Sequence, residues 1–274
     1  MPPMPRRLSA GPCTGVGGEP LDGAAGPWGC GAVGLRRRGA AGPWGCGAVG
    51  LRRRGAAGPW GRGMGGVGAG VGVGVRFLVL GDSLAFGTGA ATPQDTLGAR
   101  LTRSLREAGH DVQLQVLAVP GATSLDLADQ VRRVSGQVDL AMLVVGANDL
   151  TRQVPPAQAA AALGHAVGEL GERGATVLVV PTPDLSSVAW VPPAFRAVVA
   201  GICDQLRARQ TLAAESAGAV VAPVAPELSR RFAADPALFS PDRFHPSSAG
   251  YALVAEALAP RLLELADRRQ EGAA

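Results

Sequence analysis

Residues 75–84 read VRFLVLGDSL, and this stretch decides how the rest of the chain is interpreted. Its first six residues form a short apolar run, which is typical of a strand buried on both faces of a sheet. Gly81 ends the run, and the polar residues Asp82 and Ser83 follow at once. We therefore expect a buried strand that presents polar side chains at its carboxyl end.

Further apolar runs follow, and they alternate with stretches of helical periodicity. The expected strands cover residues 75–80, 112–119, 140–145, 176–180 and 220–224. The expected helices cover residues 96–108 with Asp95 as N-cap, 124–134 with Ser124 as cap, 156–173, 193–217, and 248–268 with a kink at Pro260. This alternation, with central strands that are apolar throughout, predicts an α/β fold with a five-stranded parallel sheet covered on both faces.

The first 74 residues differ in composition from the remaining 200. They hold 24 of the 40 glycines and nine arginines against two acidic residues, whereas the rest holds 17 arginines against 20 acidic residues. Residues 24–39 (AAGPWGCGAVGLRRRG) recur identically at 40–55, and 56–61 begin a third copy. Such a Gly-rich stretch buries too little apolar surface to offset its chain entropy. We expect residues 1–74 to be a low-complexity tail, disordered or an artefact of the assigned start site, and residues 75–274 to form the domain.

Composition also narrows the functional classes. The net charge of +4 comes from the tail, so it gives no reason to expect that the domain binds nucleic acid. No apolar run is long enough for a spanning helix, and no apolar leader follows Arg6 and Arg7. Of four cysteines only Cys203 lies in the domain, which is compatible with a reducing compartment. We therefore expect a cytoplasmic protein without a transmembrane segment.

Four polar blocks stand where the expected strands end or where the last helix begins. They read Gly81-Asp82-Ser83-Leu84, Pro120-Gly121-Ala122-Thr123-Ser124, Gly146-Ala147-Asn148-Asp149 and Asp242-Arg243-Phe244-His245. Ligands of open parallel sheets bind at the carboxyl ends of the strands. We therefore expect these blocks to meet at one edge of the sheet.

The blocks hold the parts that nucleophilic catalysis by a serine requires. A serine hydroxyl is a poor nucleophile until a neighbouring base takes its proton. His245 precedes a proline, which favours an extended backbone and a ring held out on a loop. Asp242, three residues earlier, can accept the imidazole Nδ1–H and so fix the tautomer. The other histidines, His110 and His165, lie at a helix end and within a helix, where we expect structural or solvated roles.

In this order the four blocks resemble those of the SGNH/GDSL hydrolase family, and the resemblance covers residues 75–265. It implies a flavodoxin-like three-layer α/β/α sandwich. It also implies a catalytic triad of Ser83, Asp242 and His245.

The resemblance further implies an oxyanion hole. Its donors are the backbone N–H groups of Ser83 and Gly121 and the side-chain amide of Asn148. A glycine at 121 suits this role because a side chain would obstruct the ester. We expect Asp82 and Asp149 to brace loops through hydrogen bonds rather than to act in catalysis, and Thr123 and Ser124 to form a turn and a cap.

The function implied is a metal-independent serine hydrolase that cleaves an ester or thioester of a small or lipidic acyl substrate through an acyl-enzyme, without a cofactor. An acyltransferase or a carbohydrate O-deacetylase on the same fold remains an alternative, as does a non-enzymatic Arg/Gly protein that binds nucleic acid. The α/β-hydrolase fold is disfavoured because its Gly-x-Ser-x-Gly motif needs a glycine where Ala85 stands. Neither His-Glu-x-x-His nor paired Cys-x-x-Cys is present. Residues 181–192 and 225–240, the expected loops around an acyl pocket, carry no motif.

Overall fold

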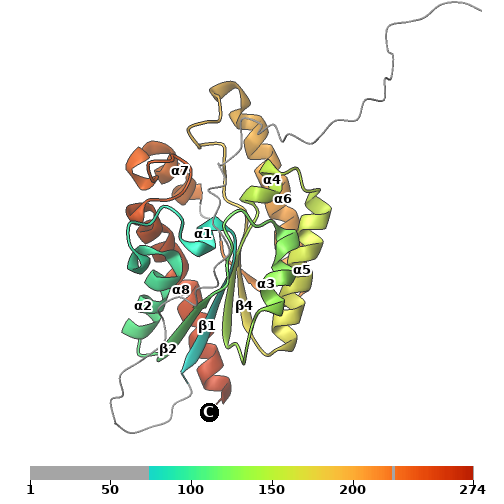
Figure 1. Cartoon of the computed structure of the whole chain (residues 1–274), viewed down its shortest axis with the longest axis vertical. Helices are drawn as coiled ribbons and strands as arrows, with labels where there is room; N and C mark the ends of the chain where they lie inside the picture. The colour runs from blue at the N-terminus through green and yellow to red at the C-terminus, as the bar shows by residue number, and fades with distance from the viewer. Residues whose placement is uncertain (1–73, 224–225, 274) are drawn as a thin grey trace, which may run out of the picture. The chain divides into compact units, whose positions relative to one another are not determined.

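The computed structural model describes residues 74–223 and 226–273, and a five-stranded sheet forms its centre (Figure 1). All neighbouring strands pair in parallel, in the order β2-β1-β3-β4-β5. The strands are β1 (Val75–Gly81), β2 (Val112–Val116), β3 (Leu140–Val144), β4 (Thr176–Val180) and β5 (Val220–Val221). The predictions about the tail concern residues that, except for Gly74, lie outside the described part.

Helices cover both faces of the sheet. In Figure 1, α2 and α8 lie on one side of it, and α3, α5 and α6 lie on the other. The α-helices are α1 (Ser83–Phe86), α2 (Leu97–Glu107), α3 (Leu127–Arg132), α4 (Ala147–Thr151), α5 (Pro156–Glu172), α6 (Arg196–Ser216), α7 (Pro226–Ala234) and α8 (Ser248–Ala273). Short 3-10 turns cover Pro93–Asp95, Ser124–Asp126, Pro193–Phe195 and Pro236–Leu238. The predicted three-layer α/β/α class with a parallel sheet is thus confirmed.

Alternate residues of β1 enter two separate cores. Phe77 and Val79 pack with side chains of α2 and α8, whereas Leu78 and Leu80 pack with side chains of α3 and α5. All four side chains are at most 1% exposed. Because both faces of the strand are buried from Phe77 onward, its sequence from there to Leu80 is apolar instead of alternating with polar residues.

The strand order creates a crossing point beside β1. After β2 the chain passes to the other side of β1, so that β3 becomes the second neighbour of β1. In open parallel sheets the ligand crevice lies at the carboxyl ends of the strands where the order reverses in this way. The segments that follow β1, β2 and β3 therefore begin at the place where a ligand would bind.

Several predicted boundaries differ from the structure. β2 ends at Val116 rather than at 119, although the N–H groups of Leu117 and Val119 still donate to the carbonyls of Val79 and Gly81. The N-cap of α2 is Thr96, whose Oγ1 accepts from the Ala99 N–H, and not Asp95. Asp95 instead closes the preceding 3-10 turn.

The helices also differ in extent from the prediction. Residues 193–195 and 124–126 form 3-10 turns ahead of α6 and α3, and α8 continues through Pro260 to Ala273. Three helices were not predicted, namely α1, α4 and α7. The first two are only one turn long, so they show no apolar periodicity, and α7 lies in a segment that we expected to be a loop.

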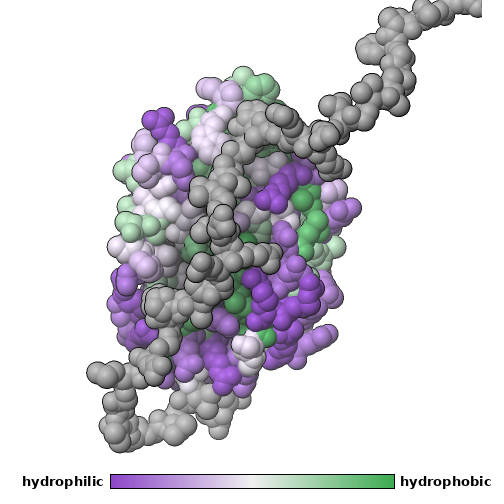
Figure 2. All heavy atoms as spheres, in the orientation of Figure 1, coloured by the Kyte–Doolittle hydropathy of each residue, from purple (hydrophilic) through white to green (hydrophobic). Residues whose placement is uncertain are grey.

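The surface of the domain mixes polar and apolar side chains. Hydrophilic residues dominate the lower part of the face drawn in Figure 2, with smaller hydrophobic patches between them. Among residues 74–223 and 226–273, no helix combines the length and the apolar character that crossing a bilayer would need.

Candidate active site

The carboxyl end of β1 places Ser83 by a sharp turn at Gly81. Gly81 has a φ of +129°, and a Cβ at this position would lie 1.8 Å from the carbonyl oxygen of Val144, so only glycine fits. Asp82 then donates its N–H to the same carbonyl at 3.0 Å and caps α1 by accepting from the Leu84 N–H at 2.9 Å. These contacts hold Ser83 as the first residue of α1, with 8% of its surface exposed.

Ser83, His245 and Asp242 form one chain of hydrogen bonds. His245 Nε2 lies 2.9 Å from Ser83 Oγ, and its Nδ1 lies 2.6 Å from Asp242 Oδ2. The other carboxylate oxygen of Asp242 accepts from the Ser240 hydroxyl and from the N–H groups of Phe244 and His245, at 2.8, 2.8 and 2.9 Å. The structure therefore brings together the three residues that the sequence placed in a triad.

The hydrogen bonds of Asp242 determine its charge. Partial burial opposes its ionisation, but the bonds donated by the His245 ring, by two backbone N–H groups and by Ser240 outweigh burial and bring the pKa to about 2. Asp242 is therefore an anion at neutral pH and accepts Nδ1–H. A neutral His245 then presents the lone pair of Nε2 to the Ser83 hydroxyl.

The loop that carries these residues folds back on itself. Arg243 adopts a φ of +57°, which is sparsely populated for a residue with a side chain, and its N–H donates to the Ser240 carbonyl at 2.9 Å. Ser240 N–H donates in turn to the His245 carbonyl at 2.8 Å. The Phe244 ring meets the His245 ring edge to face, with centroids 4.9 Å apart. This turn keeps the Asp242 carboxylate within hydrogen-bond distance of the His245 imidazole.

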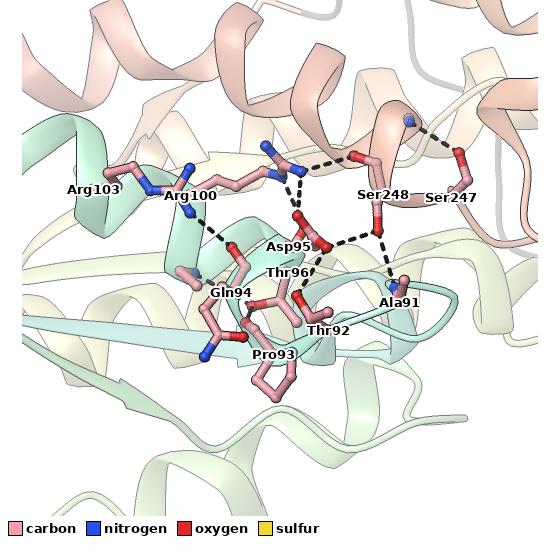
Figure 3. A network of polar contacts seen from close by, with 12 residues as sticks. Ala91, Thr92, Pro93, Gln94, Asp95, Thr96, Arg100, Arg103, Ser247 and Ser248 are labelled. Atoms are coloured by element: carbon pink, nitrogen blue, oxygen red, sulfur yellow. Dashed lines mark hydrogen bonds and ion pairs between the residues drawn. The ribbon is translucent and has the colours of Figure 1, made fainter.

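A polar network fixes the His245 loop to the segment that follows Ser83 (Figure 3). Ser248, the first residue of α8, accepts from the Ala91 N–H at 3.0 Å and donates to Asp95 Oδ2 at 3.1 Å. The Arg100 guanidinium binds both the Asp95 carboxylate, at 2.6 Å, and the Ser248 carbonyl, at 3.1 Å. Hydrogen bonds, that of Thr92 foremost, lower the pKa of Asp95, so that the network has a fixed anion at its centre.

Direct packing joins the same two segments. The buried Tyr251 of α8 donates its hydroxyl to the Thr88 carbonyl at 2.8 Å. A Cβ on Gly89 would lie 2.5 Å from the Pro246 carbonyl oxygen and 3.0 Å from His245 Cβ. The distance between Ser83 and His245 is therefore set by contacts on both sides of the pair.

Asn148 and Gly121 lie on neighbouring loops that are tied together. The side-chain amide of Asn148, on α4, donates to the Ala122 carbonyl at 2.9 Å, which uses one of its two N–H groups. Gly121 has a φ of +83°, and within the described residues no acceptor engages its N–H or that of Ser83. Three N–H donors thus remain available on the segments that follow β1, β2 and β3.

Two buried carboxyl groups brace these loops, as expected. Asp149 is fully buried and accepts from the N–H and the hydroxyl of Ser124, with the hydroxyl at 2.8 Å. Burial raises the pKa of Asp149. Burial also raises the pKa of Asp82 to about 7, against the Leu84 hydrogen bond, and the neighbouring charge of Asp149 adds to the rise.

Two buried glutamines, which the sequence analysis missed, hold the strand ends. Gln130 of α3 pairs with both the N–H and the carbonyl of Gly81, each at 2.8 Å. Gln210 of α6 accepts from the N–H and the hydroxyl of Thr182, at 2.9 and 2.7 Å, and donates to the Val145 carbonyl at 3.0 Å. Both lie among apolar residues on the buried faces of their helices, and an amide at such a position is the signal that could have revealed them.

An apolar cavity of about 130 Å³ lies among β4, α7, α8 and the segments that carry Ser83 and His245. Leu84, Phe244 and Pro246, which flank these two residues in sequence, form part of its wall. The remaining wall comes mainly from β4, the segment after it, α7 and α8, and includes Val180, Leu185, Phe232, Phe239 and Leu258. The wall of the cavity is mostly apolar, so it can take an apolar group of a ligand.

The other candidate residues lie away from this site. His110 is buried and bonds Asp267 of α8 at 3.1 Å, and His165 pairs with Glu169 one turn along α5. Cys203 is a buried free thiol whose pKa burial raises. Among the residues that the structure describes, no group of three His, Cys, Asp or Glu side chains could hold a metal ion.

Residues 79–253 match the model of the GDSL-like lipase/acylhydrolase family. The chain belongs to this family. A curated GDSL-like esterase of Mycobacterium tuberculosis is 36% identical over 189 residues, which cover 67% of this chain and 60% of that protein.

Solved structures of similar fold are known. The crystal structure of TesA has a TM-score of 0.57 at 21% identity and covers 69% of this chain and 99% of TesA. The acetylxylan esterase Axe2 of Geobacillus stearothermophilus has a TM-score of 0.54 at 20% identity, over 68% of this chain and 94% of Axe2. At these identities the likeness shows the fold.

Gln210→Leu should destabilise the domain. The variant would leave the Val145 carbonyl and the Thr182 N–H without a partner in a buried place, and each such group costs about 1–3 kcal/mol. We expect the free energy of unfolding, measured by urea titration, to fall by about 2–5 kcal/mol. Gln205→Leu, on the exposed face of the same helix, is the matched control and should change it little. Equal effects of both variants would contradict a structural role of the Gln210 amide.

The raised pKa of Asp82 should make stability depend on pH. The folded state keeps the Asp82 proton up to about pH 7, whereas the unfolded chain releases it near the ordinary value of 3.8. The contribution of this group to the free energy of unfolding is therefore complete below pH 3.8 and is lost as pH rises through about 7. Urea titrations between pH 3.8 and about pH 7 should show that the free energy of unfolding falls as pH rises. The Asp82→Asn variant, which keeps an oxygen to accept the Leu84 N–H, should show a smaller fall. If the free energy of unfolding depended on pH equally in the Asp82→Asn variant and in the native chain, Asp82 would not be the group with the raised pKa.

Proposed function

We propose that this chain is a serine esterase that hydrolyses carboxylic esters through a covalent acyl-enzyme on Ser83, without a metal ion. The observation that carries the proposal is the unbroken chain of hydrogen bonds from Asp242 through His245 to Ser83, with distances of 2.6 and 2.9 Å. The family membership and the relative named as an esterase support the same reaction class.

In the first step Ser83 Oγ attacks the carbonyl carbon of the ester. As the new C–O bond forms, the hydroxyl proton passes to His245 Nε2. The Asp242 carboxylate, ionised because its pKa is about 2, then stabilises the imidazolium through the Nδ1–H bond. The electron pair of the carbonyl π bond moves onto its oxygen, which becomes an oxyanion.

The backbone N–H groups of Ser83 and Gly121 and the second amide N–H of Asn148 are the proposed donors to this oxyanion. Donors fixed before the reaction stabilise charge without reorganising, and this is often the largest contribution to catalysis. The bond from Asn148 to the Ala122 carbonyl supports this role because it fixes the amide with its NH₂ group, rather than its oxygen, toward the Gly121 loop. Gly121 has no side chain of its own that would obstruct the ester.

Collapse of the tetrahedral intermediate re-forms the carbonyl and breaks the bond to the alcohol oxygen, which takes the proton from His245 Nε2. The acyl group then remains on Ser83. Water repeats the sequence: His245 takes its proton, the oxygen attacks the acyl carbon, and Ser83 Oγ leaves with the proton. We place the acyl chain in the apolar cavity beside Leu84 and Phe244, because carbon atoms form most of its wall. This lining favours an aliphatic acyl group over a polar sugar.

Ser83→Ala and His245→Ala should each lower turnover by several orders of magnitude, because each removes a partner of one coupled proton transfer. The measurement is hydrolysis of para-nitrophenyl hexanoate by the purified chain. A serine-directed phosphonate should label the native protein stoichiometrically, as mass spectrometry would show, and should leave Ser83→Ala unlabelled. EDTA should not change the rate. Inhibition by the chelator, or labelling of the alanine variant, would contradict the proposal.

Asn148→Ala should lower kcat by about 10²–10³ with a small change in KM, because the amide acts mainly on the oxyanion of the transition state. Asn148→Asp is closer in shape but replaces N–H donors by an anion that repels the oxyanion. It should therefore be at least as damaging as alanine. Melting curves of both variants serve as the control for folding. A folded Asn148→Asp variant that keeps most of its turnover would show that Asn148 is not an oxyanion donor.

A further inference from the structure

A second hollow, unlike the apolar cavity, lies at the Gly121 end of the site. This open groove measures about 640 Å³, and its walls come from the segment after β2, from α3 and from the end of α4. Three arginines line it, Arg132, Arg133 and Arg152, together with Asp126 and Asp129. The groove therefore carries an excess of positive charge. It is continuous with the proposed oxyanion donor Gly121, which lines it as well.

The arginines of this groove differ in their partners. Arg132 forms an ion pair with Asp129, and Arg133 donates to the carbonyls of Asp129 and Leu117. The guanidinium of Arg152 has no hydrogen bond and no ion pair with any residue that the structure describes. An exposed arginine next to a groove and without a carboxylate is the group that an anion would bind.

The structure also fixes where Arg152 stands. Arg152 is the C-cap of α4, and its backbone N–H donates to the Asn148 carbonyl at 2.9 Å. Its Nη2 lies 3.1 Å from the point that a Cβ on residue 121 would occupy, so the guanidinium covers the outer side of Gly121. One short helix therefore carries both Asn148 and a free cation, and the two border Gly121 and the Ala122 carbonyl.

We propose that the groove beside Gly121 is a binding subsite for an anionic group on the alcohol portion of the substrate, with Arg152 as the residue that recognises it. The proposal rests on the proposed esterase reaction. In this proposal the acyl chain fills the apolar cavity on the His245 side. The alcohol portion must therefore extend from the reacting carbonyl carbon in another direction. The open groove at Gly121 gives the alcohol portion room, and a carboxylate or phosphoryl oxygen on it would contact the Arg152 guanidinium.

The experiment compares esters that differ only in charge. The hexanoate ester of para-hydroxybenzoate carries a carboxylate on its alcohol portion, and its methyl ester is the neutral match. The hexanoate ester of para-hydroxyphenyl phosphate tests a phosphoryl group. Monophenyl adipate and phenyl methyl adipate place the same charge contrast on the acyl portion. The measured quantity is the ratio of kcat/KM for the charged ester to that for its neutral match, in the native chain and in variants of Arg152.

The native chain should prefer esters with a charged alcohol portion, and added salt should weaken the preference because the guanidinium is exposed. Arg152→Ala should lower the ratio about five- to tenfold, the range for a partly screened charge-assisted contact. Arg152→Glu should invert the preference, and Arg152→Lys should keep part of it. Arg268→Ala removes an exposed arginine near the end of α8, outside the site, and should change nothing.

Three results would overturn the subsite. The ratio could be the same in Arg152→Glu as in the native chain. Charged and neutral esters could lose rate equally in Arg152→Ala, which would mean that the cation acts on the oxyanion and not on the substrate. The preference could also follow the charge on the acyl portion. Failure of the native chain to hydrolyse any of these esters, the neutral ones included, would instead overturn the proposed function.

Discussion

The close approach of β1 to β3 is the constraint on which the site depends. Residue 81 has no room for a Cβ against the Val144 carbonyl, and that carbonyl accepts the N–H of Asp82. Such an approach requires that the two strands be neighbours, which follows from the crossing of the chain after β2. As a result the segments that carry Ser83, at the start of α1, and Asn148, near the start of α4, leave neighbouring strand ends. The topology of the sheet therefore brings the proposed nucleophile and a proposed oxyanion donor to the same edge.

Amide side chains hold this geometry where the strands end. The strand ends expose N–H and C=O groups that no further strand pairs, and an unpaired buried polar group is costly. A glutamine both donates and accepts, so Gln130 satisfies the two polar groups of Gly81 at once, which a glutamate could not do. Gln210 does the same between β3 and β4. Two helices on one face of the sheet thus hold the strand ends from which the loops with the proposed donors start.

The fold class could be predicted because continuous apolar strands that alternate with helical periodicity are local patterns. The residues proposed for catalysis were found because the four polar blocks, including those at Ser83, Asn148 and His245, resemble those of a known family in type and order. The missed features depend on three-dimensional context. α1 and α4 are single turns held by Asp82 and by the sheet, and they have no periodicity to detect. The groove at Arg152 arises from residues of three separate segments, and no spacing in the sequence relates Arg152 to Gly121.

The carboxyl groups around Ser83 differ in pKa according to their position, and this difference suits the proposed reaction. Asp242, beyond the imidazole, is held ionised with a pKa of about 2, where its charge stabilises the imidazolium. Asp82 and Asp149, near the proposed oxyanion donors, are buried, and burial raises the pKa of both. A raised pKa favours the neutral carboxyl, so less negative charge opposes the oxyanion from behind its donors. Arg152 adds positive charge at the outer side of Gly121. The ionised Asp242 carboxylate therefore stands on the imidazole side of Ser83, where positive charge forms in the proposed reaction, and Arg152 stands on the Gly121 side, where the proposed donors would meet the oxyanion.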